Sequence, residues 1–294
     1  MCKYKNNRSS KREDVVKCFQ KSYELIRHYR LDSEQSIKQA FDEQVWSWVY
    51  RDFSYRTLTV KQNGMTIKDF TSIAKDFLAK NYYLYFSQDT LAYYKYNDLN
   101  NAILCENFES WHENMCESLL ELIRKRYIDK LENGQGYTDV EYGKAQKIIN
   151  MVFKYIYCFD DSAKYASKFE PCHMTIDAII IDWTADIVFP ALGDDSPRRS
   201  NSVKWSKSFR KGSVEEEYTY LWYQEKIKEF LKNNYLDQNG MPFWPIVAEF
   251  YAWPEEQWIR TTKEWLTLDV NQDYFPKYKN KYVDQMNREI RKHI

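Results

Sequence analysis

The sequence predicts a mainly α-helical fold, a compact bundle-like domain of several helices with at most one short strand or hairpin. Only 7 Gly and 7 Pro occur among the 294 residues, whereas sandwiches and barrels need a turn about every 8 to 12 residues. Apolar residues recur instead at the spacing of helices. Hydrophobic residues make up 44% of the chain and aromatic residues 17%, which excludes disorder for the bulk of it.

The chain is expected to begin with a solvated basic tail over residues 1–12, followed by a single helical domain over 13–294. Two packed halves, 13–135 and 136–294, are the alternative division. The boundary between these halves follows an Asn-Gly pair, which is a turn signal.

The N-terminal half is predicted to be a succession of helices. Apolar spacing predicts a first helix over about 13–30. Potential N-cap residues then precede two further helices, Asp32 or Ser33 before the first of them and Thr66 before the second. A longer helix is expected from Cys105 to Leu131. The alternating, β-branched run Tyr55–Val60 predicts the one short strand or extended segment.

Two buried helices are predicted at the centre of the fold. The first begins at the capping box Thr138–Glu141 and is apolar nearly all round. The second follows a loop of roughly 15 residues and has Thr175 or Asp177 in its N-terminal turn. Amphipathic helices over 215–233 and 242–258 are expected to pack around them.

Overall composition excludes several classes of function. The 43 Lys and Arg balance 43 Asp and Glu, so affinity for phosphates requires a local basic patch. The six cysteines lack the spacing of a disulfide framework or zinc site, and we expect no metal and no cofactor. Phosphate-loop, serine-hydrolase and zincin motifs do not occur. No membrane-spanning segment or signal peptide is predicted, which favours the cytoplasm.

Lys147 and Asp177 form the constellation best suited to chemistry. Lys147 falls within the first apolar helix, where an ammonium is desolvated and a fraction becomes the nucleophilic amine. Asp177 falls at the start of the second, where the helix dipole and free N–H groups keep a carboxylate ionised. A fixed carboxylate stabilises an oxocarbenium-like state while the amine captures the sugar carbon.

The two stretches that carry this pair read Gly143-Lys144-Ala145-Gln146-Lys147 and Thr175-Ile176-Asp177. They resemble the helix-hairpin-helix DNA glycosylases of the 8-oxoguanine type, including the divergent archaeal ones, over about 40 residues. In that family a G-x-G-x-K hairpin presents the catalytic lysine and a Pro-Val-Asp segment presents the aspartate. Ala145 and Thr175 depart from this pattern. The resemblance implies that Lys147 is the Schiff-base nucleophile and Asp177 the catalytic carboxylate.

The strongest basic patch lies at residues 196–213, which contain no acidic residue. Trp205 and Phe209 are interleaved with the cations, a pattern typical of segments that follow a nucleic-acid backbone and stack on bases. A mobile surface loop explains the same composition. The candidate DNA-binding residues are Arg198, Arg199, Lys204, Lys207, Arg210 and Lys211.

Other polar residues have simpler explanations. Cys172 and His173 are neighbours without further ligands, and we interpret them as part of a packed loop. Asp182 and Asp186 share one helix face and could bind Mg²⁺ in a nuclease. A solvated helix face explains these two carboxylates equally well.

These observations predict a DNA base-excision glycosylase and lyase that acts on duplex DNA through Lys147 and Asp177. The alternative is a non-catalytic α-helical interaction or regulatory protein. In that alternative the Lys147 ammonium reaches solvent or forms an ordinary ion pair, and Asp177 is only an N-cap.

Overall fold

The computed structural model describes residues 26, 28–53, 55–131, 133–194, 198–207, 209–236, 240–253 and 256. The predicted basic tail lies outside these residues, as does nearly all of the helix predicted over 13–30. The described chain is mostly helical, with a few short strands in two small sheets.

The N-terminal helices begin where their N-cap residues predict. Ser33 Oγ accepts a hydrogen bond from the backbone N–H of Ser36, and Thr66 Oγ1 accepts one from that of Asp69. The first helical stretch includes one π-helical segment. The elements are α2 (Glu34–Ala40), η3 (Phe41–Val45), α3 (Trp46–Asp52), η4 (Tyr55–Thr57), β1 (Leu58–Val60) and α4 (Ile67–Ser87).

A hairpin and a long helix follow, and then a second hairpin. Asn107 caps the long helix, with reciprocal hydrogen bonds to Ser110. The elements are β2 (Ala92–Lys95), β3 (Asp98–Leu104), α5 (Phe108–Arg126), β4 (Tyr127–Lys130) and β5 (Tyr137–Thr138).

The C-terminal part is helical again. Residues 245–253 form its last described helix, within the predicted range 242–258. The elements before it are α6 (Tyr142–Ile156), η5 (Ser162–Tyr165), α7 (Ala166–Phe169), α8 (Ala178–Trp183), η6 (Thr184–Val188), α9 (Phe189–Leu192) and α10 (Tyr220–Asn234).

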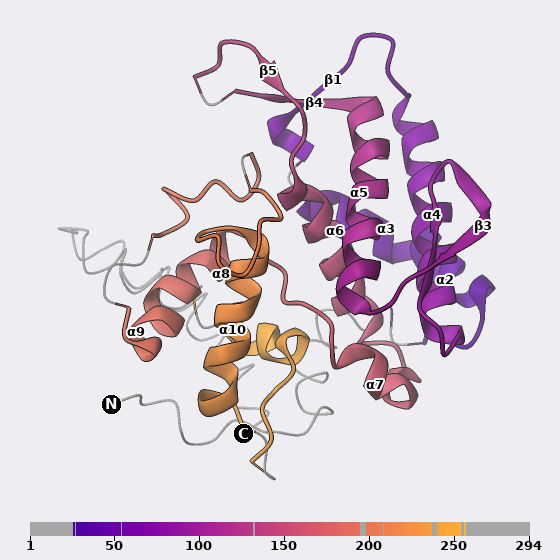
Figure 1. The fold of residues 1–294 in the computed structure, drawn as a ribbon. Helices are drawn as coiled ribbons and strands as arrows, with labels where there is room; N and C mark the ends of the chain where they lie inside the picture. Colours follow the sequence, from indigo (N-terminus) through magenta and orange to yellow (C-terminus); the bar gives the residue numbers. More distant parts are fainter. Residues whose placement is uncertain are drawn as a thin grey trace, which may run out of the picture.

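The expectation of at most one strand or hairpin is wrong. Strands β1, β4 and β5 form one antiparallel sheet, with Leu58 opposite Asp129 and Lys130 opposite Tyr137, and β2 and β3 form a separate hairpin. The predicted helix to Leu131 ends at Arg126, because the next four residues pair with β1 and β5. Figure 1 shows the three-stranded sheet at one end of the molecule, beyond α5 and α6.

The predicted capping box is also wrong. Thr138 belongs to β5, where it pairs with Asp129. Helix α6 begins at Tyr142, and the side chain of its N-cap residue, Glu141, makes no capping hydrogen bond. The pairing of Thr138 with a strand removes it from the helix start that its local sequence favours.

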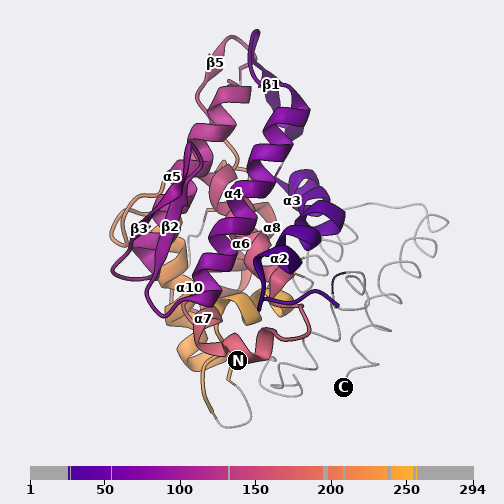
Figure 2. The same ribbon diagram turned by 90° about the vertical axis from the view of Figure 1, so that its right-hand side faces the viewer.

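Helix α6 is the centre of the core, as its apolar composition predicts. Every one of its 15 residues is buried, and α3 and α5 both contact it. Figure 2 shows α6 among α3, α4 and α5. Phe153 of α6 lies in an aromatic cluster, with ring centroids 4.8 Å from Tyr82, 5.3 Å from Tyr85 and 5.6 Å from Trp111.

Within the described residues, none of the helices has both the length and the apolar character that crossing a bilayer requires.

We expect Phe153→Ala to lower the free energy of unfolding by about 3–5 kcal/mol, because it opens a cavity inside the aromatic cluster. Denaturant unfolding measures this change. Leu104→Ala is the control, since Leu104 is 72% exposed and its loss should change the free energy by less than about 0.5 kcal/mol. Equal effects of the two substitutions would contradict the central position of α6.

Candidate functional site: a buried lysine–aspartate pair

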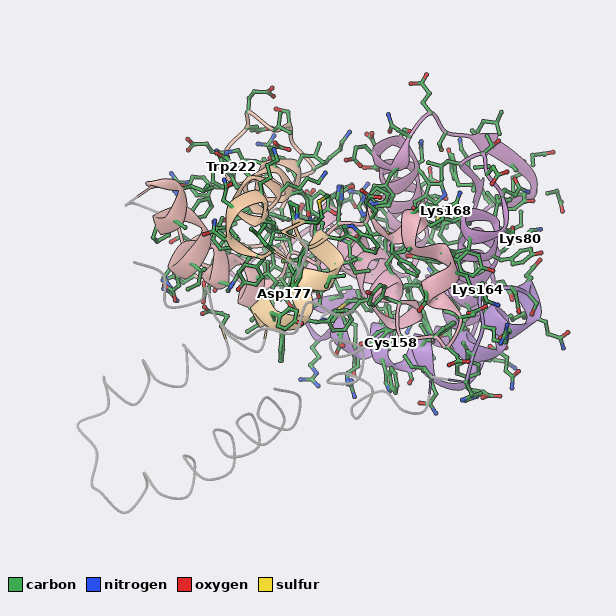
Figure 3. All side chains as sticks on the ribbon, turned by 90° about the horizontal axis from the view of Figure 1, so that it is seen from below. Lys80, Cys158, Lys164, Lys168, Asp177 and Trp222 are labelled. Carbon is green, nitrogen blue, oxygen red and sulfur yellow. The ribbon has the colours of Figure 1, made fainter. Side chains whose placement is uncertain are left out.

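The structure brings Lys147 and Asp177 together. Lys147 extends from the second turn of α6, and its Nζ lies 2.9 Å from Asp177 Oδ2. The other carboxylate oxygen of Asp177 accepts hydrogen bonds from the N–H groups of Ile179 and Ile180, which makes Asp177 the N-cap of α8. The two side chains are only 10% and 12% exposed. Figure 3 shows Asp177 among densely packed side chains.

Two buried amide side chains of α6 fix the segment that carries Asp177. Gln146 Nε2 donates to the carbonyl of Ile176, and Gln146 Oε1 accepts from the N–H of the same residue, at 2.6 and 3.3 Å. Asn150 Nδ2 donates to the carbonyl of Met174. This extended segment therefore uses side chains of α6 as its hydrogen-bonding partners. Gln146 and Asn150 were not predicted to be site residues, although polar residues in so apolar a helix were a signal.

The environment of Asp177 favours its charged form. Burial acts to raise the pKa of this carboxyl group, but the Lys147 ammonium and the N–H of Ile180 outweigh it, so the pKa of Asp177 is lowered. The indole ring of Trp205 lies over the pair, with its centroid 4.7 Å from Lys147 Nζ, within cation–π range. Lys147 is therefore held between a carboxylate and an aromatic ring.

The residues that resemble a glycosylase hairpin are helical here. Gly143 and Lys147 both lie within α6, so no hairpin presents this lysine. Gly143 instead allows a close approach of the chain near Trp205. Its N–H donates to the carbonyl of Phe209, and a Cβ at position 143 would lie 1.8 Å from the carbonyl oxygen of Trp205.

A second buried lysine, Lys144, lies beside the pair. Its side chain and that of Asp129 are both fully buried, their charged atoms are 3.7 Å apart, and Lys144 Nζ donates to Thr57 Oγ1 at 2.8 Å. Burial lowers the pKa of Lys144 to about 8, against the opposing effect of Asp129. Burial also raises the pKa of Asp129, whose carboxylate oxygens accept no hydrogen bond within the described residues.

Lys154 makes the third buried ion pair of α6. Its Nζ lies 2.8 Å from Glu249 Oε1, in the helix 245–253. Glu249 Oε2 accepts the N–H of Thr175 at 2.7 Å, two residues before Asp177. The lysines of α6 are thus matched by carboxylates from three different segments.

The predicted DNA-binding residues lie in a strap, defined here as residues 198–207 and 209–213, which covers the start of α6. Most of their cationic groups contact other parts of the chain. Lys207 Nζ donates to the carbonyl of Lys130, and Lys204 is exposed. The remaining contacts are Arg199 with Asp182, Asp186 and Glu256, Arg210 with Glu216, Lys211 with Glu113, and Arg198 over the ring of Tyr218.

The other polar residues considered in the sequence have structural partners. Asp182 and Asp186 face Arg199, and Asp182 also accepts the N–H of Ser200 at 2.7 Å. His173 is buried and its Nδ1 lies 2.8 Å from Tyr220 Oη. Among the residues that the structure describes, no group of three or more His, Cys, Asp or Glu could hold a metal ion.

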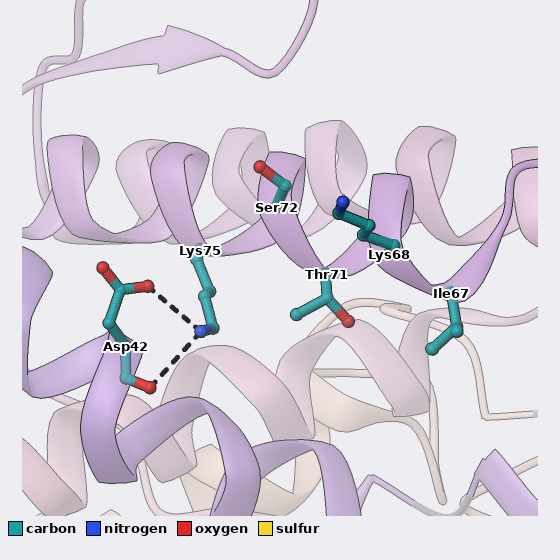
Figure 4. Close-up of a pocket in the computed structure, with 6 residues that line it drawn as sticks. All are labelled: Asp42, Ile67, Lys68, Thr71, Ser72 and Lys75. Carbon is teal, nitrogen blue, oxygen red and sulfur yellow. Dashed lines mark hydrogen bonds and ion pairs between the residues drawn. The ribbon is translucent and has the colours of Figure 1, made fainter.

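A surface pocket lies away from this site, between α4 and η3 (Figure 4). Lys75 Nζ crosses it to Asp42, at 3.0 Å from Oδ1. The other lining residues are Ile67, Lys68, Thr71 and Ser72. None of them is a residue for which the sequence predicts chemistry.

Comparisons of the chain with protein-family models, with curated proteins and with solved structures gave no match.

We expect Lys147→Met to lower the free energy of unfolding by about 3 kcal/mol, because it leaves the Asp177 charge buried without its partner. Asp177→Asn keeps a good N-cap and should cost a similar amount. The double variant should cost less than the sum of the two by at least about 1 kcal/mol, as measured by a double-mutant cycle. Lys226→Met, in an exposed pair with Glu229, is the control. Additive single effects would contradict a coupled pair.

We expect the stability difference between the wild type and Lys144→Met to change with pH. The folded chain loses the Lys144 proton near pH 8, whereas the unfolded chain holds it to an ordinary pKa. The unfolded state then binds more protons, so the wild type should gain about 1–2 kcal/mol relative to the variant between pH 8 and 9.5. Denaturant unfolding across this range measures the gain, and a constant difference would show that Lys144 titrates normally.

Proposed function

We propose that the chain is a DNA base-excision glycosylase and lyase, in which Lys147 is the nucleophile and Asp177 assists it. The observation that supports this most directly is the 2.9 Å approach of Lys147 Nζ to Asp177 Oδ2, across 30 residues of sequence. A glycosylase of this kind needs both groups at one sugar carbon. The resemblance of the stretches that carry them points to the same reaction.

The chemistry assigns one step to each group. The ionised Asp177 stabilises positive charge on the deoxyribose as the bond from C1′ to the base breaks. The Lys147 ammonium gives one proton to the departing base, and the free amine that results forms a bond to C1′. When the C1′–O4′ bond then opens and O4′ takes the second amine proton, the product is an iminium between Lys147 and C1′. This intermediate can be reduced by borohydride.

The substrate must reach a pair that is now covered. An extruded nucleotide needs a pocket between aromatic and apolar walls, and Trp205 occupies the position over Lys147. The reaction therefore requires the strap to move. Arg198 and Lys204 are exposed in the strap, and this exposure supports a role for them in binding backbone phosphates.

The second candidate is a non-catalytic helical protein. It is favoured by the similarity of the Lys147–Asp177 pair to the Lys154–Glu249 pair on the same helix, at 2.9 and 2.8 Å. In this alternative both pairs position segments around α6 and neither reacts.

We expect borohydride to trap a covalent adduct between the protein and duplex DNA carrying an abasic site or 8-oxoguanine. Lys147→Ala should abolish the adduct, and Asp177→Asn should slow its formation by about a hundredfold or more. Lys154→Met is the matched control, since it also removes a buried ion pair of α6 but leaves the proposed nucleophile. Circular dichroism of each variant separates loss of reaction from loss of fold.

The outcomes divide the two candidates. An adduct on the abasic site alone would limit the activity to the lyase step. The absence of any adduct, together with no detectable DNA binding at low salt, would overturn the proposal in favour of the non-catalytic protein.

A further inference from the structure

Ion pairs with acidic residues of the same chain fasten the two ends of the strap, and the side chains of Val203, Trp205 and Phe209 between them are buried in the core. Arg199 forms two hydrogen bonds with the carboxylate of Asp186, at 2.5 and 3.1 Å, and its Nη2 lies 3.7 Å from Asp182. Lys211 Nζ lies 2.5 Å from Glu113 of α5. The Arg199 and Lys211 side chains are about one-third exposed, at 36% and 33%.

The same strap covers the reactive pair. Trp205 lies between the cations at the two ends and contacts Lys147 through its ring. One backbone hydrogen bond, from Gly143 to Phe209, joins the strap to the first turn of α6. Displacement of the end contacts would therefore loosen the part of the strap that closes the site, which is otherwise held by this hydrogen bond and by its buried aromatic side chains.

We propose that the phosphates of duplex DNA open this strap by competing with the carboxylates of Asp182, Asp186 and Glu113 for its cations. This inference rests on the proposed function, and it identifies DNA as the ligand that exposes Lys147. Phosphate and carboxylate accept the same paired hydrogen bonds from a guanidinium. The Arg199 and Lys211 side chains are accessible to phosphates, although Asp182 and Asp186 are only 11% and 14% exposed, so the phosphates must outweigh partly buried ion pairs.

The partners of the strap cations differ before and after DNA binds. Before DNA binds, the acids neutralise the cations of the strap and hold Trp205 over the amine. Once phosphates take over the cations, Asp182 and Asp186 lose the compensation of Arg199 and repel one another, a cost that the phosphate contacts must outweigh. The strap then follows the DNA, and Lys147 becomes accessible at the moment when substrate is present.

The test is the rate at which a water-soluble acetylating reagent modifies Lys147. The intact protein is labelled and then digested, and mass spectrometry measures the acetylation of the peptide that contains Lys147. Undamaged duplex DNA at low salt should raise this rate by about tenfold, as expected if opening replaces charged hydrogen bonds. Hydrogen exchange of the Gly143 amide should rise in parallel. Inorganic polyphosphate in place of DNA tests whether phosphate charge alone is enough to open the strap.

A pair of variants separates the strap from DNA binding. Asp182→Asn with Asp186→Asn should raise the labelling of Lys147 without DNA, because Arg199 loses two of its three carboxylate partners and keeps only Glu256. Asp76→Asn is the control, since it removes an acid from an exposed pair with Lys38 outside the strap.

Two outcomes would overturn the inference. In the first, DNA binds but the labelling rate of Lys147 does not change. This result would leave the DNA-binding part of the proposed function intact. The second is the absence of DNA binding together with unchanged labelling in the double variant. A failure of borohydride trapping with DNA-dependent labelling would overturn the proposed reaction and keep the opening of the strap.

Discussion

The burial of α6 is the constraint on which the rest of the structure depends. Water cannot hydrate charged groups on a helix that is buried on every side, yet three residues of α6 are lysines. A buried ammonium without a partner costs several kcal/mol, so each lysine requires a carboxylate from another segment. Asp129 comes from β4, Asp177 from the start of α8 and Glu249 from the helix 245–253. The charges of one helix thereby determine which segments surround it.

Several features set by local sequence were predicted, whereas most of those set by distant partners were not. The N-caps Ser33, Thr66 and Asp177 lie where expected because a cap is a contact with residues two or three positions away. The end of α5 was missed because β4 is a strand only through its pairing with β1, almost 70 positions earlier in the chain. The approach of Lys147 to Asp177 was anticipated from a resemblance and not from any physical rule about spacing.

Lys144 shows why the site was only partly predictable. In the sequence it is one residue of a short motif, and its neighbours give no sign that Thr57 and Asp129 meet it. The basic strap has the same difficulty, because a run of cations suggests a free patch while its acidic partners lie elsewhere in the chain. Local charge density therefore overestimates the positive surface that this segment offers to a ligand.

Glu249 links two segments that are made at very different times. It neutralises Lys154, 95 residues earlier, and also fixes the N–H of Thr175 ahead of the proposed catalytic aspartate. At a synthesis rate of about 5–20 residues per second, α6 leaves the ribosome roughly 5–20 s before its last carboxylate does. During that interval the inner half of α6 has an uncompensated charge and an exposed aromatic face. The nascent chain is thus a natural client for chaperones until Glu249 has been made.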